Sequence, residues 1–347
     1  MFLKKKVELL ILLALLTTHS GFAKQSNISI TSLKATPQLQ KAFDFILAEE
    51  KQNEVDLIRL TEIPAPPFME EARAKHFAAM LKDSGADDVQ IDGVGNVIAT
   101  IKGNVGSKTI AVAAHLDTVF PPDTEIKVRR EGSRLVAPGV GDNTRGLIMV
   151  NTLMKAIHAA QIKMQANVLL LGTVGEEGLG DLRGVKYLFR DGAPRIDSFI
   201  AIDGNTPGRI VTSAIGSNRY RVTFSGPGGH SWRAFGHANP HHALGHAIAL
   251  FDEMAASVTD EGEKSSYNVG RIGGGTSVNS IPFSSWMEVD IRSGSQDRLE
   301  KLDGIFKRAL QQALLTENSA RKHGPELTLA IKKVGERPSA NGENESS

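Results

Sequence analysis

Carboxylates and a histidine stand at four places directly after short apolar runs or in a glycine-rich loop. These are His115 with Asp117, then Asp142, the adjacent pair Glu176 and Glu177, and Asp203. Imidazole nitrogen and carboxylate oxygen are ligands that zinc takes from proteins. The set therefore predicts a metal site, provided that the fold brings the four places together.

The two adjacent glutamates can perform separate tasks. Side chains of neighbouring residues in extended backbone point to opposite sides. Glu177 can thus bind a cation while Glu176 faces the reacting groups and transfers a proton, a combination that metal-dependent hydrolysis requires. A pair of solvated surface carboxylates is the alternative.

The elements that must position these residues alternate between strand and helix. Apolar runs predict strands at 96–101, 109–114, 168–173 and 199–202, and helical spacing covers 37–61, 70–84 and 146–160. This order predicts an α/β fold with a parallel or mixed β-sheet flanked by helices. Ligands of such sheets bind beyond the carboxyl ends of the strands, where His115 and Asp203 fall. Two-residue periodicity puts Asp117 on the same face as His115, whose ring it can orient.

The pattern changes near residue 213. Residues 219–224 and 286–291 alternate between apolar and polar side chains, which predicts strands, and each is followed by a helical segment, at 240–257 and 296–319. We therefore expect two domains, a catalytic domain over 37–212 and an inserted α+β domain over 213–333. The chain ends in the polar tail 340–347.

Composition is that of a globular protein, with 347 residues of which 41% are hydrophobic and 23% charged. Residues 1–23 combine three lysines, a short apolar run and a small-residue cleavage site, which predicts a signal peptide and a periplasmic or secreted protein. Removal of the signal peptide changes the formal charge of the chain from +1 to about −1, so we expect neither nucleic-acid binding nor membrane association of the mature chain. The chain has no cysteine, which excludes disulfides and thiolate catalysis.

A dinucleotide-binding enzyme is a weaker alternative. Glycines at 178, 180 and 184 follow a strand, and Asp203 lies at a distance suited to a ribose-binding acid. The glycine spacing differs from that fingerprint, and nearby carboxylates would repel a pyrophosphate.

The four places together resemble the motifs of di-zinc metallopeptidases grouped with glutamate carboxypeptidase, aminoacylase and peptidase T. The motifs are His115-Leu-Asp117, Gly141-Asp142-Asn143, Gly175-Glu176-Glu177-Gly178 and Ile202-Asp203-Gly204. The resemblance implies that His115, Asp142 and Asp203 hold one zinc, and that Asp142 bridges to a second zinc bound by Glu177. It further implies that Glu176 is the general base, that Asp117 supports the site from behind, and that the Asp142–Asn143 peptide is cis.

The inserted domain is similar to the lid through which members of that family form homodimers. Gly226-Pro-Gly-Gly-His230-Ser231 resembles the segment whose histidine reaches the partner's active site and stabilises the oxyanion. Asn279 and Arg292 resemble lid residues that bind substrate, Arg292 through a carboxylate. Taken alone, Arg292 is better explained as a charge on an edge strand.

The resemblance implies that residues 334–347 begin a return from the lid to the catalytic domain, which supplies a last zinc-binding histidine in that family. No histidine follows His323 in this sequence. On that basis we expect the second zinc to keep only Asp142 and Glu177, and a weakened enzyme with one zinc. The hypothesis is an exported zinc hydrolase that cleaves amide bonds in small peptides or N-acyl amino acids. The alternative is an inactive, truncated relative that dimerises or binds peptides.

Overall fold

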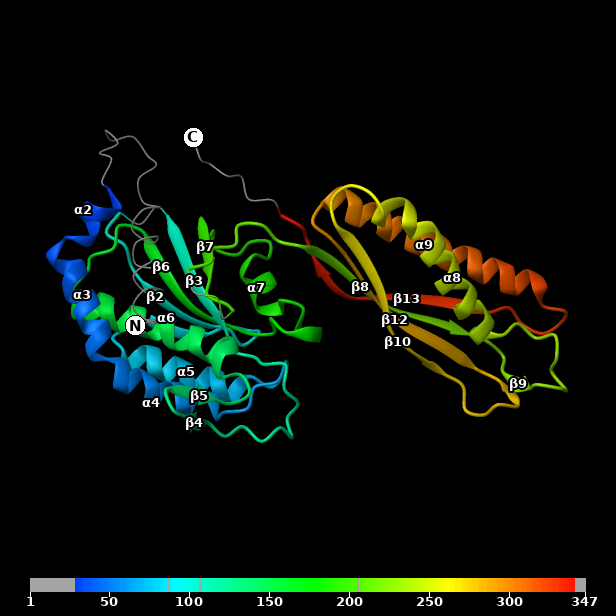
Figure 1. The fold of residues 1–347 in the computed structure, drawn as a ribbon, viewed down its shortest axis with the longest axis horizontal. Coiled ribbons are helices and arrows are strands. Elements are labelled where there is room, and N and C mark those ends of the chain that lie inside the picture. Colours follow the sequence, from blue (N-terminus) through cyan, green and yellow to red (C-terminus); the bar gives the residue numbers. More distant parts are fainter. Residues whose placement is uncertain (1–28, 87, 106–107, 205, 207, 341–347) are drawn as a thin grey trace. The chain divides into compact units, whose positions relative to one another are not determined.

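The computed structural model describes residues 29–86, 88–105, 108–204, 206 and 208–340. The expected signal peptide at 1–23 and the end of the polar tail at 341–347 lie outside the described residues. The chain divides into two compact units, residues 1–209 and residues 210–347. Each unit contains its own sheet and its own hydrophobic core (Figure 1).

The first unit is built on a five-stranded mixed sheet with the order β1-β2-β6-β3-β7. The central β3 runs parallel to β6 and β7, whereas β2 pairs antiparallel with both β1 and β6. This arrangement confirms the predicted mixed α/β sheet. The strands span Asp88–Ile91 (β1), Val97–Ile101 (β2), Thr109–His115 (β3), Asn167–Thr173 (β6) and Ser198–Ala201 (β7), and a separate hairpin is formed by Arg129–Glu131 (β4) and Arg134–Val136 (β5).

Within the described residues, six α-helices accompany this sheet. They are α2 (Ile30–Lys34), α3 (Pro37–Ala48), α4 (Glu50–Thr61), α5 (Glu71–Asp83), α6 (Arg145–Ala159) and α7 (Arg183–Leu188). The expected single helix over 37–61 is wrong, because Glu49 interrupts it with a ψ of 0°. The Glu49 N–H bonds to the carbonyl of Phe45 and closes α3, while its carbonyl accepts from Asn53 and begins α4.

Both faces of the sheet are covered. Helices α5 and α6 pack against one face, where Ala99, Val112 and Leu170 lie in the main core, and α3 packs against α6 (Figure 1). The opposite face carries Ala111 and Leu171, which pack with Leu188 of α7 in a smaller core. A strand buried on both faces is apolar along its whole length, which explains the continuous apolar run of β3.

The second unit is a four-stranded antiparallel sheet with the order β10-β12-β8-β13, covered on one face by two helices (Figure 1). Its elements are β8 (Gly216–Ser225), α8 (Pro240–Thr259), β10 (Ser265–Gly274), β12 (Ser284–Ser293), α9 (Gln296–Ala320) and β13 (Thr328–Arg337), with a small ladder of β9 (Gly229–His230) and β11 (Ser280–Ile281). Within the described residues, no helix has the length and apolar character that crossing a membrane requires.

The end of β13 differs from the expected start of a return at residue 334. A register shift between Lys333 and Gly335 lets the strand continue, and Arg337 still pairs with Ser217 of β8. Residues 335–337 therefore belong to the sheet of the second unit.

Candidate metal centre

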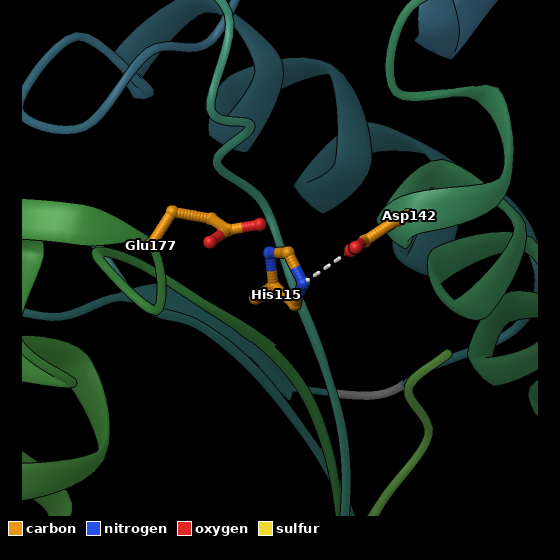
Figure 2. A group of neighbouring side chains, drawn as sticks. All are labelled: His115, Asp142 and Glu177. Carbon is orange, nitrogen blue, oxygen red and sulfur yellow. Dashed lines mark hydrogen bonds and ion pairs between the residues drawn. The ribbon is translucent and has the colours of Figure 1, made fainter. Parts of the chain in front are cut away.

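The predicted metal ligands come together at the carboxyl edge of the first sheet. His115 is the last residue of β3, Glu177 follows β6 and Asp203 follows β7, and these three strands run parallel. Asp142 arrives from the turn Val140–Thr144 that leads into α6. One donor atom each of His115, Asp142 and Glu177 lies within 4.8 Å of the others, and Figure 2 shows the Asp142 and Glu177 carboxylates turned toward the imidazole.

The imidazole of His115 is buried among carboxylates. Its Nε2 lies 2.9 Å from Oδ1 of Asp142 and 3.8 Å from Oδ1 of Asp203. Burial lowers the pKa of His115, but its interactions with Asp117, Asp142 and Asp203 outweigh burial and raise that pKa to about 12. The surroundings of this ring thus strongly favour a positive charge, which is the property that a cation site needs.

Asp117 connects the histidine with the glutamate pair. Nδ1 of His115 lies 2.9 Å from the backbone carbonyl of Asp117 and 3.6 Å from its carboxylate. The same buried carboxylate accepts hydrogen bonds from the backbone N–H groups of Glu176 and Glu177, at 2.9 and 2.8 Å. Burial raises the pKa of Asp117, but the bonds from His115, Glu177 and Glu176 lower it below its usual value. Asp117 is therefore ionised at neutral pH.

Glu177 is the member of the pair that enters the donor group. Burial raises its pKa, and the negative charges of Glu176 and Asp142 raise it further. A cation at this point would relieve the repulsion among the carboxylates. The donor set therefore fits a divalent metal, with Glu176 adjacent to Glu177 along the chain but outside the donor group.

The residue that follows Asp142 helps to hold the turn that carries it. The peptide bond between Asp142 and Asn143 is cis, as the resemblance implies. The buried side chain of Asn143 donates a 2.7 Å hydrogen bond to the carbonyl of Ile202. This bond ties the turn that carries Asp142 to the end of β7, from which Asp203 extends.

Two other buried side chains support the site and were not predicted. Arg73 on α5 donates to the carbonyl of Leu116, next to Asp117, at 2.9 Å. Asn96 accepts from the N–H of Val174 at 3.1 Å and donates to the carbonyl of Gly184 at 3.0 Å, and so fixes both ends of the segment that contains the glutamates. Their polar residue types alone give no signal, because each bonds to backbone groups that are distant in sequence.

The three predicted lid residues lie in the second unit. His230 is exposed on β9, where its Nδ1 accepts from the N–H of Trp232 at 3.2 Å. Asn279 directly precedes β11, and its carbonyl accepts from the N–H of Ser231, the residue after His230, at 2.9 Å.

Arg292 lies on β12 and bonds to Asp290 at 2.7 Å. The edge-strand interpretation of Arg292 is wrong, because β12 lies between β10 and β8.

A metal-dependent hydrolase is the class of protein that this sheet, donor group and glutamate pair define. Residues 111–317 match the model of peptidase family M20/M25/M40, and the chain belongs to that family. Its members are metal-dependent, and the chain is accordingly a hydrolase. The non-catalytic alternative is not favoured.

Individual relatives resemble the chain over most of its length. YqjE of Bacillus subtilis strain 168 is 24% identical over 283 residues, which are 77% of this chain and 73% of that protein. The crystal structure of aminopeptidase PepT from Bacillus cereus superposes with a TM-score of 0.63 at 21% identity, covering 85% of this chain and 79% of that one. A tripeptidase from Staphylococcus aureus gives a TM-score of 0.64 at 19% identity, with coverages of 86% and 79%. These two likenesses show the fold.

Proposed function

We propose that the protein is a zinc-dependent hydrolase of small peptides or N-acyl amino acids, acting as an exopeptidase, dipeptidase or amidohydrolase. The observation that carries this proposal is the convergence of His115, Asp142 and Glu177, with Glu176 adjacent, at the carboxyl edge of the sheet. The aminopeptidase and tripeptidase descriptions of the similar structures support peptides as the substrate class.

The ligands of one zinc are proposed to be His115, Asp142 and Asp203, and Asp142 and Glu177 are proposed to serve a second metal position. One imidazole with carboxylates is a donor set that suits catalytic zinc. When bound, zinc acts as a Lewis acid that polarises the scissile carbonyl and acidifies water.

The chain's own residues supply the proton transfer and the alignment. Glu176 is proposed to accept the proton of the attacking water and later to give it to the leaving amine. Its backbone N–H donates to the carboxylate of Asp117, and the backbone carbonyl of the same residue lies 2.9 Å from Nδ1 of His115. The base and the imidazole are therefore positioned by a single buried residue.

Exchange of the base tests the proposal. Glu176→Gln keeps the size of the side chain and removes its basicity, so kcat for a panel of dipeptides should fall by about 10² to 10⁴ while zinc content is retained. Glu131→Gln, an exposed change on β4, is the matched control and should leave kcat unchanged. Zinc is measured by elemental analysis of dialysed protein. Equal turnover by wild type and Glu176→Gln would exclude Glu176 as the base.

We also propose that the second unit forms a homodimer in which His230 serves the partner's active site. Large apolar side chains are exposed on both sides of the β9–β11 ladder, with Trp232 exposed to 85%, Phe283 to 70% and Val278 fully. Exposed aromatic and aliphatic groups of this kind are typical of a contact surface.

Subunit mixing tests this arrangement. His230→Ala and Glu176→Gln should each be inactive. A sample reassorted from equal amounts of the two should recover about a quarter of the wild-type rate, because about half of its dimers are heterodimers and one of the two sites in each heterodimer is intact. Failure of the mixed sample to recover activity, with heterodimers demonstrated by mass spectrometry, would refute the exchange of His230 between subunits.

A further inference from the structure

A cavity opens beside the proposed metal ligands in the first unit. It has a volume of about 720 Å³, within the range of small-molecule sites, and Asp142 and Glu177 form part of its wall. Val119 and Phe120 contribute apolar surface. A molecule bound here would therefore place one end against the donor group and the remainder against a partly apolar wall.

Arg145 also lines this cavity, and its guanidinium has no hydrogen-bond or ion-pair partner among the residues that the structure describes. The Nη2 atom of Arg145 is buried and makes no hydrogen bond, and no ion pair joins Arg145 to any residue that the structure describes. A buried donor without an acceptor costs free energy, and the cost is greater for a charged group. The structure thus keeps a cationic donor in the wall without an internal partner.

The position of Arg145 gives it no evident role in helix stability. Arg145 is the first residue of α6, where the helix dipole disfavours positive charge and favours an acidic side chain. It also forms no ion pair with Asp142 or Glu177, although all three line the same cavity. Neither capping nor charge compensation within the site accounts for the arginine.

Arg134 on β5 adds a second positive charge to the wall. Its side chain is exposed, and no ion pair joins it to the described part of the chain. Once cations neutralise the carboxylates of the donor group, the two arginines leave the cavity with an excess of positive charge. An anionic substrate is the molecule that matches this wall.

We propose that Arg145, assisted by Arg134, binds the acidic side chain of the substrate, so that the enzyme prefers small peptides or N-acyl amino acids containing aspartate or glutamate. This inference rests on the proposed function and names its substrate class. A guanidinium holds a carboxylate through two parallel hydrogen bonds, which gives both affinity and orientation. The role differs from that of Arg292 on the lid, which the resemblance links to another carboxylate.

Matched dipeptides test the preference. Glutamyl-alanine is compared with glutaminyl-alanine, and alanyl-glutamate with alanyl-glutamine, so that each pair differs only in one side-chain charge. Wild type should favour the acidic member of at least one pair by about tenfold or more in kcat/KM, the effect of one charge-assisted hydrogen bond. Arg145→Gln should reduce the ratio to about one, and Arg145→Lys should restore part of it. Arg129→Gln, an exposed arginine outside the cavity, should keep the wild-type ratio.

The outcomes separate this inference from the proposed function. Equal hydrolysis of both members of each pair by wild type would overturn the subsite and leave the hydrolase standing. If no peptide is hydrolysed, the proposed function fails, and calorimetric binding of the same peptides to the Glu176→Gln protein decides about the subsite. The subsite is supported if Glu176→Gln binds an acidic peptide about tenfold more tightly than its amide counterpart and if Glu176→Gln/Arg145→Gln does not. Equal affinities of Glu176→Gln for the two peptides refute the subsite. Should Arg145→Gln fail to fold by circular dichroism, Arg134→Gln provides the decisive variant, with a smaller loss of the ratio expected.

Discussion

The carboxylate of Asp117 accepts a hydrogen bond from the backbone N–H of Glu177 at 2.8 Å. The same carboxylate lies 3.6 Å from Nδ1 of His115 and also accepts from the N–H of Glu176. One buried anion therefore joins the end of β3 to the segment after β6. The spacing of the proposed ligands depends on it.

Asp117→Asn should weaken metal binding. An amide has the same shape, and its oxygen can still accept from one glutamate N–H, but its nitrogen cannot accept from the other. The amide also leaves the region around His115 less negative. Loss of a group that orients metal ligands lowers affinity by about 10- to 100-fold, and we expect a decrease of that size. Competition with a chromophoric chelator measures it. Asp83→Asn at the exposed end of α5 is the control, and equal affinities of Asp117→Asn and wild type would contradict the assigned role.

Gly146→Ala should destabilise the first unit, although alanine is normally the better helix residue by about 1 kcal/mol. A Cβ at this position would lie 2.1 Å from Oδ1 of Asn143, whose amide is held by the carbonyl of Ile202. Overpacking at such a site costs about 1–3 kcal/mol. Gly245→Ala on α8 has open space around the new methyl group and should instead be stabilising by up to about 1 kcal/mol. Urea unfolding of both variants checks the opposite signs, and stabilisation by both would contradict the packing.

Metal binding should release protons. His115 has a pKa of about 12 in the folded protein, compared with about 6.5 in an unfolded chain, and only the neutral imidazole can bind a metal. Each zinc bound through His115 at pH 8 should therefore displace about one proton, and affinity should rise with pH. Calorimetry in buffers of different ionisation enthalpy counts these protons. Binding without proton release would show that His115 is neutral before the metal arrives.

In the presence of a chelator, the raised pKa of His115 also makes the free energy of unfolding depend on pH. The protonated imidazole stabilises the fold fully below about pH 6.5, and this contribution is lost as the pH rises toward 12. Wild type should have a larger free energy of unfolding than His115→Gln at low pH, and this difference should shrink as the pH rises through that window. An advantage that grows with pH would contradict the raised pKa.

The convergence of His115, Asp142, Glu177 and Asp203 could be predicted because parallel strands place their carboxyl ends at one edge. The cis bond after Asp142 came from the resemblance and is present. The bonds of Asn143 to Ile202 and of Arg73 to Leu116 could not be predicted, since their acceptors are backbone carbonyls that carry no side-chain signature. The break between α3 and α4 at Glu49 could not be predicted either. The helical spacing of apolar side chains continues past Glu49, and only the backbone ψ of this residue departs from the helix.

Arg73→Lys should destabilise the first unit, although the substitution keeps the positive charge. Arg73 is fully buried and donates from Nη1 to Leu116, from Nη2 to Thr61 and from Nε to Ile63, always to carbonyl oxygen. An ammonium cannot reproduce this planar fork, so at least two buried carbonyls lose their donor, at roughly 1–3 kcal/mol each.

The free energy of unfolding should therefore fall by at least about 2 kcal/mol in Arg73→Lys. Arg59→Lys, on the exposed side of α4, should change it by no more than about 0.5 kcal/mol. Metal affinity should fall with the first variant only, because Leu116 stands between His115 and Asp117. A stable Arg73→Lys protein with unchanged metal affinity would show that the fork does not position the site.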